Sequence, residues 1–518
     1  MNVLYALRRA LWMHPDAAAI YDGESAITYR QFGDRVARLA NTLRDLGVRP
    51  GERVAVLMLN SMAYLELYHA AALARAIIVP INIRWNPADI LFSLTDSGSR
   101  LLVIDDCFAR LQSALHAALP DLAFLFAGKG PCPAGMHSYA GCMAQASAQL
   151  PEEPEPPEDD VVGLFYTSGS TGGPKGVMLT HRNLCANAIY CMLSMRISPQ
   201  WIFLHSAPMF HLADGAIVYS IVMQGGANCF QAAFDPEAWL RMIQERRVTH
   251  SVLVPAMLNM VVNHPTIGKY DVSSLQMVLY GASPMPIDVL RRAKDKLRCA
   301  FAQAYGLTEA SPVLTYLGPE DHAFDNLDAR FTPVKSGGRP VLGVEVKVVD
   351  AMDRELPPGE VGEIVARGAN IMKGYWNQPA ITADTLRGGW LHTGDMGVFD
   401  ERGYLYVKDR KKDMIKPGGE NVYSPEVEST IASHPDVLEV AVIGVPDEKW
   451  TEAVKAVVVQ RPGSALTERG LIDFCRERMT HFKCPTSVDF VDSLPKGGTG
   501  KLQKNVLREQ YRAKVAVQ

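Results

Sequence analysis

Short apolar runs alternate with helical patterns in the N-terminal part of the chain. Apolar residues recur at steps of three and four over residues 28–46, which predicts a helix, and a second helix is predicted over 62–75. The runs 53–59, 77–79 and 101–104 are short and apolar, which predicts strands. Strands and helices that alternate in this way are typical of parallel sheets with crossover helices.

The C-terminal part of the chain follows a different pattern. The runs 404–407, 441–444 and 456–459 predict strands, and residues 471–479 predict a helix. Six charged residues in a row, 408–413, follow the first of these strands. The whole pattern therefore predicts an α/β protein, in which a large N-terminal domain of layered sheets and helices precedes a small α+β domain.

Composition and charge exclude several classes of protein. The chain has 518 residues, which is too long for one ordinary core, and its net charge of −4 gives no electrostatic reason to expect nucleic acid as a partner. None of the nine cysteines forms a C-x-x-C pair, and such a scattered set is typical of a reducing compartment, so we expect a cytoplasmic protein. Because no apolar run reaches about 18 residues, we expect no integral membrane segment. The acidic, proline-rich residues 151–160 are expected to form a surface connector.

One glycine- and hydroxyl-rich segment carries the strongest chemical signal. It reads Tyr-Thr-Ser-Gly-Ser-Thr-Gly-Gly-Pro-Lys-Gly over residues 166–176, directly after the apolar run 161–165. Glycines let the backbone bend closely around a ligand, and free amides, hydroxyls and an ammonium group suit a polyphosphate. The segment therefore predicts a site for a nucleotide triphosphate.

The common phosphate loops do not fit this segment. A P-loop counted from Gly169 would need glycine where Pro174 stands, and a hydroxyl residue where Gly176 follows Lys175. The dinucleotide fingerprint does not fit either. A flexible linker is the plain alternative, but a linker needs no strand before it, and Val177 resumes the apolar character directly after it.

The segment resembles the phosphate loop of the adenylate-forming enzymes, which include acyl-CoA synthetases, the amino-acid-activating domains of peptide synthetases and beetle luciferases. Further segments resemble motifs of that family, in the family's order, so that the resemblance spans nearly the whole chain. These segments are an acyl-site segment at 208–211, an adenine-side turn at 280–284, a Y-G-x-T-E match at 305–309, a T-G-D match at 393–395, a hinge motif at 409–413 and a last lysine motif at 495–501.

The resemblance implies an ATP-dependent acid–thiol ligase that uses Mg²⁺ and coenzyme A. In such an enzyme a carboxylate attacks the α-phosphate of ATP, pyrophosphate leaves, and the acyl group then passes to the thiol as AMP departs. A fatty acid is the favoured substrate, and an aryl acid of the benzoate or cinnamate type stays open. An enzyme that loads a carrier protein and a non-catalytic nucleotide-binding protein also stay open. A homodimer is left open.

The resemblance further implies a division of the chain at a hinge. The hinge residue would be Lys412, between a large N-terminal domain of residues 1–409 and a small mobile lid of residues 410–518. Rotation at this hinge would bring Lys416, Gly418 and Gly419 toward coenzyme A.

The resemblance assigns the parts of ATP to separate segments. The adenine turn reads Gly-Ala-Ser-Pro, whereas many members of the family have Gly-Gly-Ala-Pro. The phosphates are assigned to Thr167, Ser168, Gly169, Ser170, Thr171, Gly172 and Lys175. The adenine ring is assigned to Gly281, Ala282, Ser283 and Tyr305, and the ribose to Asp395 and Arg410.

The resemblance also names catalytic residues. Lys501 would bridge the carboxylate and the α-phosphate as negative charge builds up, and Thr308 would reach the α-phosphate. Thr167 and Glu309 would bind Mg²⁺, which prefers hard oxygen ligands and keeps several waters. His211 lies in the acyl-site segment and is a candidate catalytic residue, although a lone histidine on an apolar segment is more often structural.

Overall fold

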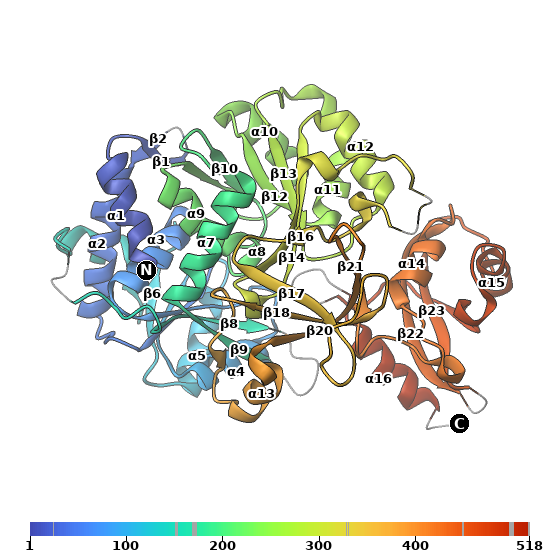
Figure 1. Ribbon diagram of the computed structural model, residues 1–518. Coiled ribbons are helices and arrows are strands. Elements are labelled where there is room, and N and C mark those ends of the chain that lie inside the picture. Colours follow the sequence, from blue (N-terminus) through green and yellow to red (C-terminus); the bar gives the residue numbers. More distant parts are fainter. Residues whose placement is uncertain are drawn as a thin grey trace. The chain divides into compact units, whose positions relative to one another are not determined.

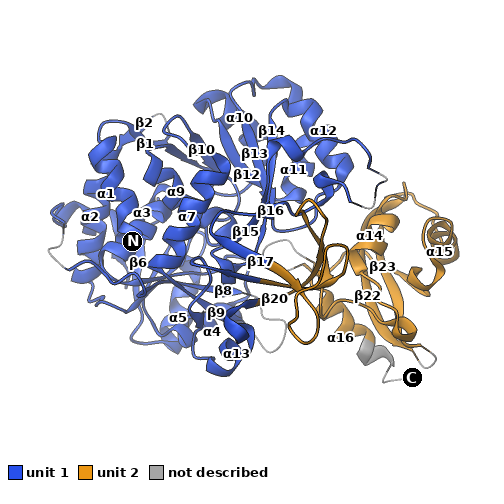
Figure 2. Ribbon diagram, in the orientation of Figure 1, with its two compact units in different colours: residues 1–346, 366–391 blue, residues 347–365, 392–518 orange. Residues whose placement is uncertain are grey.

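The computed structural model divides into two compact units, shown in Figure 2. Unit 1 contains residues 1–346 and 366–391, and unit 2 contains residues 347–365 and 392–518. The boundary predicted between residues 409 and 410 is the point about which the two domains would rotate, and it stays a prediction. The structure describes residues 1–23, 25–150, 154–167, 174–327, 329, 331–447, 450–496 and 502–515, the last four of them without their side chains.

The first sheet of unit 1 is mostly parallel. Among the described residues, the strand order is β16-β15-β14-β13-β12-β10-β11-β1-β2. Strands β10, β12, β13 and β14 are neighbours in the sheet and run parallel to one another. Its strands are β1 (Ala18–Asp22), β2 (Ser25–Thr28), β10 (Ile202–His205), β11 (Ala227–Phe230), β12 (His250–Leu253), β13 (Met277–Gly281), β14 (Ala300–Gly306), β15 (Val313–Leu317) and β16 (Arg339–Pro340).

The second sheet of unit 1 contains the strands predicted near the N-terminus. Its described order is β19-β9-β8-β4-β3-β5-β6-β7, and β3 pairs in parallel with both β4 and β5, which confirms the predicted parallel sheet. Its strands are β3 (Arg53–Leu57), β4 (Ile77–Pro80), β5 (Ser99–Ile104), β6 (Ala123–Phe126), β7 (His137–Ser138), β8 (Val161–Thr167), β9 (Lys175–Thr180) and β19 (Gly374–Tyr375).

Helices cover both faces of each sheet because successive strand residues point to opposite faces. In β3, Val54 packs into the central cluster of unit 1 and Ala55 into an outer one; in β10, Phe203 and Leu204 divide in the same way. The central cluster unites the two sheets with α1 (Leu4–Met13), α2 (Tyr29–Asp45), α3 (Met62–Leu73), α7 (His181–Met195) and α9 (Ile217–Gln224). The outer helices are α10 (Pro236–Arg246), α11 (Pro255–Val262) and α12 (Ile287–Leu297) on the first sheet, and α4 (Pro87–Ser97) and α5 (Gln112–Ala118) on the second.

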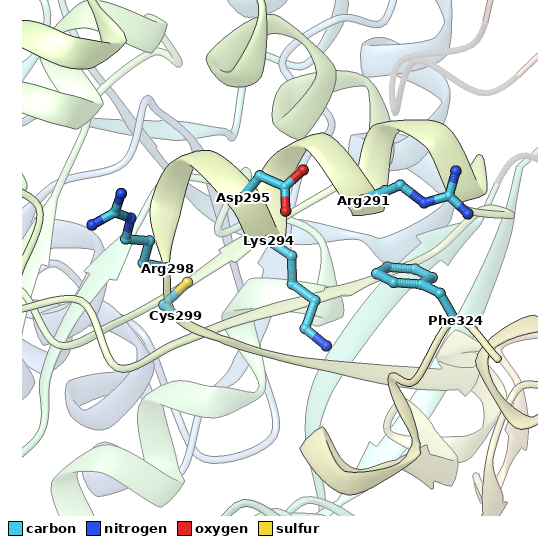
Figure 3. A pocket seen from close by; sticks show the side chains of 6 residues that line it. All are labelled: Arg291, Lys294, Asp295, Arg298, Cys299 and Phe324. Atoms are coloured by element: carbon cyan, nitrogen blue, oxygen red, sulfur yellow. The ribbon is translucent and has the colours of Figure 1, made fainter.

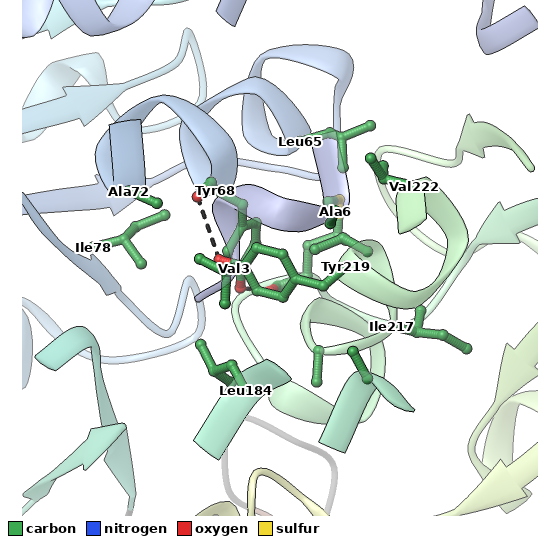
Figure 4. Packing of buried hydrophobic residues seen from close by; sticks show 14 of the residues in the cluster. Val3, Ala6, Leu65, Tyr68, Ala72, Ile78, Leu184, Ile217, Tyr219 and Val222 are labelled. Atoms are coloured by element: carbon green, nitrogen blue, oxygen red, sulfur yellow. Dashed lines mark hydrogen bonds between the residues drawn. The ribbon is translucent and has the colours of Figure 1, made fainter. Parts of the chain in front are cut away.

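Figure 4 shows the packing of the central cluster, and Figure 1 shows the helices and strands that supply it. Tyr68 of α3 and Tyr219 of α9 lie edge to face at its centre, and the Tyr219 hydroxyl donates to the Tyr68 carbonyl at 3.3 Å. The helices begin where side chains cap them: Thr28 caps α2 and Thr180 caps α7 in capping boxes. The two predicted helices and three predicted strands of this region are thus confirmed.

Unit 2 is a smaller α+β body. Its three-stranded sheet of β22 (Val437–Asp447), β23 (Thr451–Gln460) and β24 (Ser487–Phe490) packs with α14 (Ser424–Ala432), α15 (Glu468–Arg476) and α16 (Lys504–Val515). A second sheet has the described strand order β17-β18-β20-β21. Its strands are β17 (Val344–Val349), β18 (Gly362–Gly368), β20 (Leu391–Phe399) and β21 (Leu405–Arg410), and β20 and β21 form a hairpin that precedes α14 in the chain. The predicted fold class is confirmed.

Two predictions about the bulk of the chain can be compared with the structure. All nine cysteines are free thiols. Within the part of the chain that the structure describes, no helix combines the length and the apolar character needed to cross a membrane.

The acidic connector is held to unit 1 by polar and charged contacts. Glu155 binds Arg8 and Asn2, and Asp159 forms a two-bond pair with Arg182 at 2.8 and 3.1 Å. Residues 151–153 lie outside the described residues. Residues 154–160 therefore form a connector fixed to the surface of unit 1, as the sequence predicts for this tract.

Candidate active site

The predicted acyl, adenine and Y-G-x-T-E segments lie at one edge of the first sheet. Strands β10, β12, β13 and β14 are parallel neighbours, so their carboxyl ends share an edge. Residues 208–211 follow β10, residues 281–284 begin at the end of β13, and residues 306–309 begin at the end of β14. Ligands of open α/β sheets bind at this kind of edge. The order of the strands thus brings together motifs that are about 100 residues apart.

The turn that carries Thr308 and Glu309 is fixed by a buried asparagine. It forms the 3-10 turn η3 (Thr308–Ala310), and the side-chain amide of Asn370 donates to the carbonyls of Ala310 and Val313 at 2.8 Å each. The Met372 amide donates to the Glu309 carbonyl at 2.9 Å. The Y-G-x-T-E turn is therefore held by a second segment, 370–372, which the sequence motifs did not include.

Gly306 permits this turn by its lack of a side chain. A Cβ atom at this position would lie 1.8 Å from the Pro312 carbonyl oxygen, a distance that no side chain tolerates. The glycine of the Y-G-x-T-E segment is therefore required by the backbone that crosses it.

The phosphate segment leaves β8 at Thr167 and returns into β9 at Lys175. These two residues are paired across the two antiparallel strands. The Lys175 Nζ atom lies 5.5 Å from the ring centroid of Tyr375, and it forms no ion pair in the described residues. The predicted phosphate contacts between these two positions, Ser168, Gly169, Ser170, Thr171 and Gly172, lie outside the described residues.

Glu309 has one carboxylate oxygen available for a cation. Its Oε1 atom accepts a hydrogen bond of 2.8 Å from the Tyr375 hydroxyl, while no hydrogen bond to Oε2 is found within the described ranges. A carboxylate oxygen and the Thr167 hydroxyl are hard ligands of the kind that Mg²⁺ prefers. No group of three or more His, Cys, Asp or Glu side chains that could hold a metal occurs in the described residues. The oxygen donors of Glu309 and Thr167 are of the type that fits Mg²⁺.

The adenine-side turn contains a strained residue. Gly281 ends β13, where a Cβ atom would approach the Ala304 carbonyl oxygen to 2.5 Å. Ala282 follows with a φ of +66°, in the left-handed region that favours glycine. Tyr305 lies on the neighbouring strand β14, opposite Thr315. Ser283 and Tyr305 are both half-buried. The turn thus holds Ala282 in a backbone conformation that glycine would adopt without strain.

His211 caps a short helix. It is the N-cap of α8 (Leu212–Gly215), and its Nδ1 atom accepts a hydrogen bond of 3.1 Å from the Ala213 amide. This contact gives the side chain a structural task, and its predicted catalytic role stays a prediction. The acyl segment before it is fixed at Met209, whose carbonyl accepts from Tyr68 at 2.6 Å and whose amide donates to Asn60 at 2.8 Å.

A buried polar network lies directly beneath the acyl segment. His205 at the end of β10 binds the Asp214 carboxylate through Nδ1, and its Nε2 atom lies 3.0 Å from Asn228 Oδ1. All three side chains are fully buried. Burial raises the pKa of Asp214, and the neighbouring His205 opposes that rise. The sequence analysis did not find this network, because its members are separated along the chain by 9 and 23 residues.

The two predicted ribose residues are brought together in unit 2. Asp395 Oδ1 lies 2.7 Å from Arg410 Nε, and the two residues are paired across β20 and β21. Gly394 reaches a φ of +69° before Asp395, and the Gly394 carbonyl accepts from the Lys411 amide at 2.8 Å. A hairpin thus joins the T-G-D and hinge motifs.

The predicted hinge and coenzyme A segments also lie in unit 2. Lys412 is exposed in the turn after β21, and the next residue, Asp413, forms a half-buried ion pair of 2.6 Å with Arg508 of α16. Gly418 and Gly419 have φ values of +58° and +91° in the 3-10 turn η7 (Pro417–Gly419), and the Gly418 amide donates to the Trp450 carbonyl at 2.9 Å. The Lys416 amide donates to Glu452 at 2.6 Å. Lys501 lies outside the described residues.

A surface hollow of about 480 Å³ is lined by side chains of α12 and by residues near it in sequence or space, as Figure 3 shows. Lys294 of α12 donates to the His322 carbonyl at 2.8 Å and lies 5.2 Å from the ring centroid of Phe324. None of the predicted site residues that the structure describes lines this hollow, and its lining residues are Arg291, Lys294, Asp295, Arg298, Cys299 and Phe324.

The sequence analysis missed two residues that support the site. Tyr375 and Asn370 both lie in a segment that was assigned to no motif. The available signal was Gly374, since a glycine within a strand often marks the close approach of another backbone. Tyr375 could not be linked to Glu309 without the pairing of β19 with β9, and the bonds of Asn370 to Ala310 and Val313 span about 60 residues.

Comparison with known proteins identifies the family. The family model of the AMP-binding enzyme matches residues 7–376, and that of the AMP-binding enzyme C-terminal domain matches residues 426–501. The chain belongs to the AMP-binding enzyme family. The predicted resemblance to the adenylate-forming enzymes is thus confirmed, and the chain is an enzyme of the AMP-forming CoA ligase family.

Relatives of known activity cover nearly the whole chain. A feruloyl-CoA synthase of Amycolatopsis is 40% identical over 508 residues, which is 98% of each chain. A medium/long-chain-fatty-acid–CoA ligase, FadD8 of Mycobacterium tuberculosis, is 36% identical and covers 97% of this chain and 89% of its own. Among solved structures, ATP-bound MatB of Rhodopseudomonas palustris has a TM-score of 0.88 at 31% identity and covers 99% of both chains.

Proposed function

We propose that this protein is an AMP-forming acid–thiol ligase, which activates a carboxylic acid with ATP and transfers the acyl group to coenzyme A. The observation that carries the proposal is the joint placement of Lys175 and Glu309 around Tyr375, in a chain of the AMP-binding enzyme family. A cation for phosphate and a carboxylate with an available oxygen are the groups that phosphoryl chemistry on ATP needs.

In the first step, an oxygen of the acid attacks the α-phosphorus of ATP, the bond to the β-phosphate oxygen breaks, and pyrophosphate leaves. Because negative charge gathers on the phosphates, cationic side chains stabilise the transition state more than the ground state. We assign the β- and γ-phosphates to Lys175 and the segment that precedes it, and the α-phosphate to Thr308. Bound Mg²⁺ supplies charge neutralisation, and Thr167 and Glu309 would hold it.

In the second step, the thiolate sulfur of coenzyme A attacks the acyl carbon, and AMP leaves with the electron pair of the broken bond. We assign Asp395 and Arg410 to the ribose, and Gly281, Ala282, Ser283 and Tyr305 to the adenine. Lys416, Gly418 and Gly419 are proposed to face coenzyme A after rotation at Lys412, when Lys501 has left the site. This exchange rests on the resemblance to the family.

The acid belongs to one of two classes. The prediction of a fatty acid is supported by the 36% identity to a fatty-acid ligase, and the aryl-acid alternative by the 40% identity to a feruloyl-CoA synthase. Because both relatives align over nearly the whole chain, we propose the aryl acid and the fatty acid as equally supported substrates. Both acids require an apolar acyl site, so the same two half-reactions serve either. A cytoplasmic location is proposed from the scattered free cysteines.

Pyrophosphate release tests this proposal. The full-length protein is incubated with ATP, Mg²⁺ and coenzyme A, and with single acids: ferulate, cinnamate, benzoate, and saturated fatty acids of graded length. We expect one class of acid to drive release of pyrophosphate and AMP in equal amounts. If every acid leaves ATP intact, or if ADP and phosphate appear instead, the proposal is wrong.

Two further measurements distinguish the ligase from the competing functions. An enzyme that loads a carrier protein would form acyl-adenylate but accept a phosphopantetheinylated carrier in place of coenzyme A. A non-catalytic protein would bind ATP without turnover, and Lys501→Ala would change nothing. For the ligase, Lys501→Ala is expected to lower adenylate formation by roughly a hundredfold or more, as loss of a charge partner in the transition state does. Replacement of the surface residue Lys269 by Ala is the matched control.

A further inference from the structure

Tyr375 contacts both charged groups of the candidate active site. Its hydroxyl donates to Glu309 Oε1 at 2.8 Å, and its ring centroid lies 5.5 Å from the Lys175 ammonium. The side chain is buried, with 8% exposure. Glu309 and Lys175 are 134 positions apart in the sequence, and Tyr375 contacts both of them.

The backbone around Tyr375 is bonded to both of the segments that carry those groups. Tyr375 lies in β19, opposite Val177 of β9, and the Trp376 amide donates to the Gly176 carbonyl at 2.7 Å. On the other side, the Met372 amide donates to the Glu309 carbonyl at 2.9 Å. Residues 372–376 therefore join the strand that begins at Lys175 to the turn that carries Glu309.

A third contact fixes Tyr375 from α13 (Pro379–Thr385). The Tyr375 amide donates to Thr382 Oγ1 at 2.9 Å, and Thr382 Oγ1 donates in turn to the Gln378 carbonyl at 2.8 Å. The backbone of Tyr375 is held by β9 and by Thr382, and its side chain is buried, so the side chain has little freedom. Its hydroxyl and its ring can therefore each impose an orientation on a neighbour.

The two contacts act by different physical means. The phenol O–H bonds to one carboxylate oxygen of Glu309, which sets the rotation of the carboxylate and directs Oε2 away from the tyrosine. The ring face carries partial negative charge, which attracts the Lys175 ammonium without neutralising it. A carboxylate partner would neutralise the lysine, whereas an aromatic face leaves its full charge for phosphate.

We propose that Tyr375 is a positioning residue of the ligase reaction, which orients the Glu309 carboxylate toward the metal ion of the nucleotide and the Lys175 ammonium toward the phosphates. The inference rests on the proposed function, because it assigns Glu309 and Lys175 to a metal–ATP complex. The hydroxyl acts on the metal ligand and the ring acts on the phosphate ligand, so the two effects are separable.

Two variants separate the hydroxyl from the ring. Tyr375→Phe removes the hydrogen bond to Glu309 and keeps the aromatic face near Lys175. Tyr375→Leu removes both. The matched control is Tyr270→Phe, because the Tyr270 hydroxyl also donates to a glutamate, Glu237 Oε1 at 3.0 Å, and neither residue belongs to a predicted motif.

The first readout is metal binding, which does not depend on turnover. Free Mn²⁺ is measured by electron paramagnetic resonance in the presence of ATP and the full-length protein, and ATP affinity is measured separately in EDTA. We expect Tyr375→Phe to weaken Mn²⁺ binding about ten- to hundredfold, the range for a lost hydrogen bond to a charged group, with ATP affinity in EDTA unchanged. Tyr375→Leu is expected to weaken both.

A double-mutant cycle excludes a general loss of structure. In a Glu309→Gln background, Tyr375→Phe is expected to cause no further loss of Mn²⁺ binding, because its target has already been altered. If Tyr375→Phe weakens binding equally in both backgrounds, or if it binds Mn²⁺ as the Tyr270→Phe variant does, the positioning role is overturned.

The inference and the proposed function can fail separately. If the unaltered protein releases no pyrophosphate with any acid, the ligase proposal fails while the Mn²⁺ measurement still decides the role of Tyr375. If the protein does turn over an acid, the Mg²⁺ concentration for half-maximal rate is expected to rise in Tyr375→Phe by the same factor as the Mn²⁺ affinity falls. An unchanged Mg²⁺ requirement would contradict the inference.

Discussion

Asp395 and Arg410 are partners through both backbone and side chain. They face each other across the antiparallel strands β20 and β21, and Asp395 Oδ1 lies 2.7 Å from Arg410 Nε. The Asp395 side chain is 7% exposed and that of Arg410 is 46% exposed, so the arginine covers the carboxylate at the surface of the hairpin. Asp395 comes from the T-G-D motif and Arg410 from the hinge motif, and both were predicted to bind the ribose. The hairpin of β20 and β21 brings these two motifs together.

The first prediction concerns the Asp395 carboxylate. Asp395→Asn keeps the shape of the side chain but removes the charged acceptor that is proposed to bind the ribose hydroxyls. We expect KM for ATP to rise about ten- to hundredfold, since a hydrogen bond to a charged group contributes about 1.5–3 kcal/mol. Steady-state kinetics with varied ATP measure this effect. The control is Glu345→Gln, which breaks the exposed two-bond pair with Arg367, at 2.9 and 2.8 Å. A similar rise in both variants would contradict a specific role for Asp395.

The second prediction concerns the backbone crossing at Gly306. In Gly306→Ala, the new Cβ atom would lie 1.8 Å from the Pro312 carbonyl oxygen, so the Thr308–Glu309 turn must move. We expect the free energy of unfolding to fall by about 2–4 kcal/mol, as for other severely overpacked sites, with loss of acid-dependent pyrophosphate release. Urea unfolding measures the first quantity. Gly268→Ala is the control, since no atom lies within 4 Å of its Cβ position. Equal stability of the two variants would show that the turn tolerates the shift.

The third prediction concerns Ala282 in the adenine-side turn. Its φ of +66° is unfavourable for any residue with a Cβ atom. Ala282→Gly removes that strain but raises the entropy of the unfolded chain, so we expect a net gain in the free energy of unfolding of up to about 1 kcal/mol. Thermal unfolding of the nucleotide-free protein measures the gain. A loss of more than about 0.5 kcal/mol would mean that the left-handed backbone is not strained in solution.

The fourth prediction is a pH dependence from His322. Its Nδ1–H donates to the Gly318 carbonyl at 2.8 Å, and its Nε2 accepts from the Tyr280 hydroxyl at 3.0 Å, an arrangement that needs the neutral ring. Burial is the main cause that lowers the pKa of His322 from 6.5 to about 4. Because the folded pKa is lowered, the contribution of His322 to stability is complete above pH 6.5 and is lost as the pH falls toward 4.

Urea unfolding at pH 7 and at pH 4.5 tests this dependence. Between these values, the loss in the free energy of unfolding is expected to be smaller in His322→Gln than in the unaltered protein, by on the order of 2 kcal/mol. The comparison between proteins is essential, because burial also lowers the pKa of His69, His181 and His250. If the variant loses as much stability as the parent, the buried neutral ring of His322 is not the cause.

Local patterns in the sequence were sufficient for elements whose periodicity is simple. The helix predicted over 28–46 is α2, and the strand predicted over 53–59 is β3, because apolar residues recur there at the period of one element. The motif segments after β10, β13 and β14 could likewise be placed at strand ends, since each follows an apolar run.

Contacts between distant segments could not be predicted in this way. Tyr375 and Glu309 are 66 residues apart, and their contact depends on β19 joining the edge of the second sheet beside β9. The bond from His205 to Asp214 is equally hidden, because a histidine and an aspartate nine positions apart carry no periodic signal. Such residues contact the motif segments only after the chain has folded, and the order of the strands decides which segments become neighbours.

The central claim, activation of an acid through an acyl-adenylate, is tested most directly by isotope transfer. The acid found active is labelled with ¹⁸O in both carboxylate oxygens and is converted in the presence of ATP, Mg²⁺ and coenzyme A. Because a carboxylate oxygen attacks the α-phosphorus, we predict that one ¹⁸O atom per turnover appears in AMP, with none in pyrophosphate. Unlabelled AMP, or label in inorganic phosphate, would contradict the account.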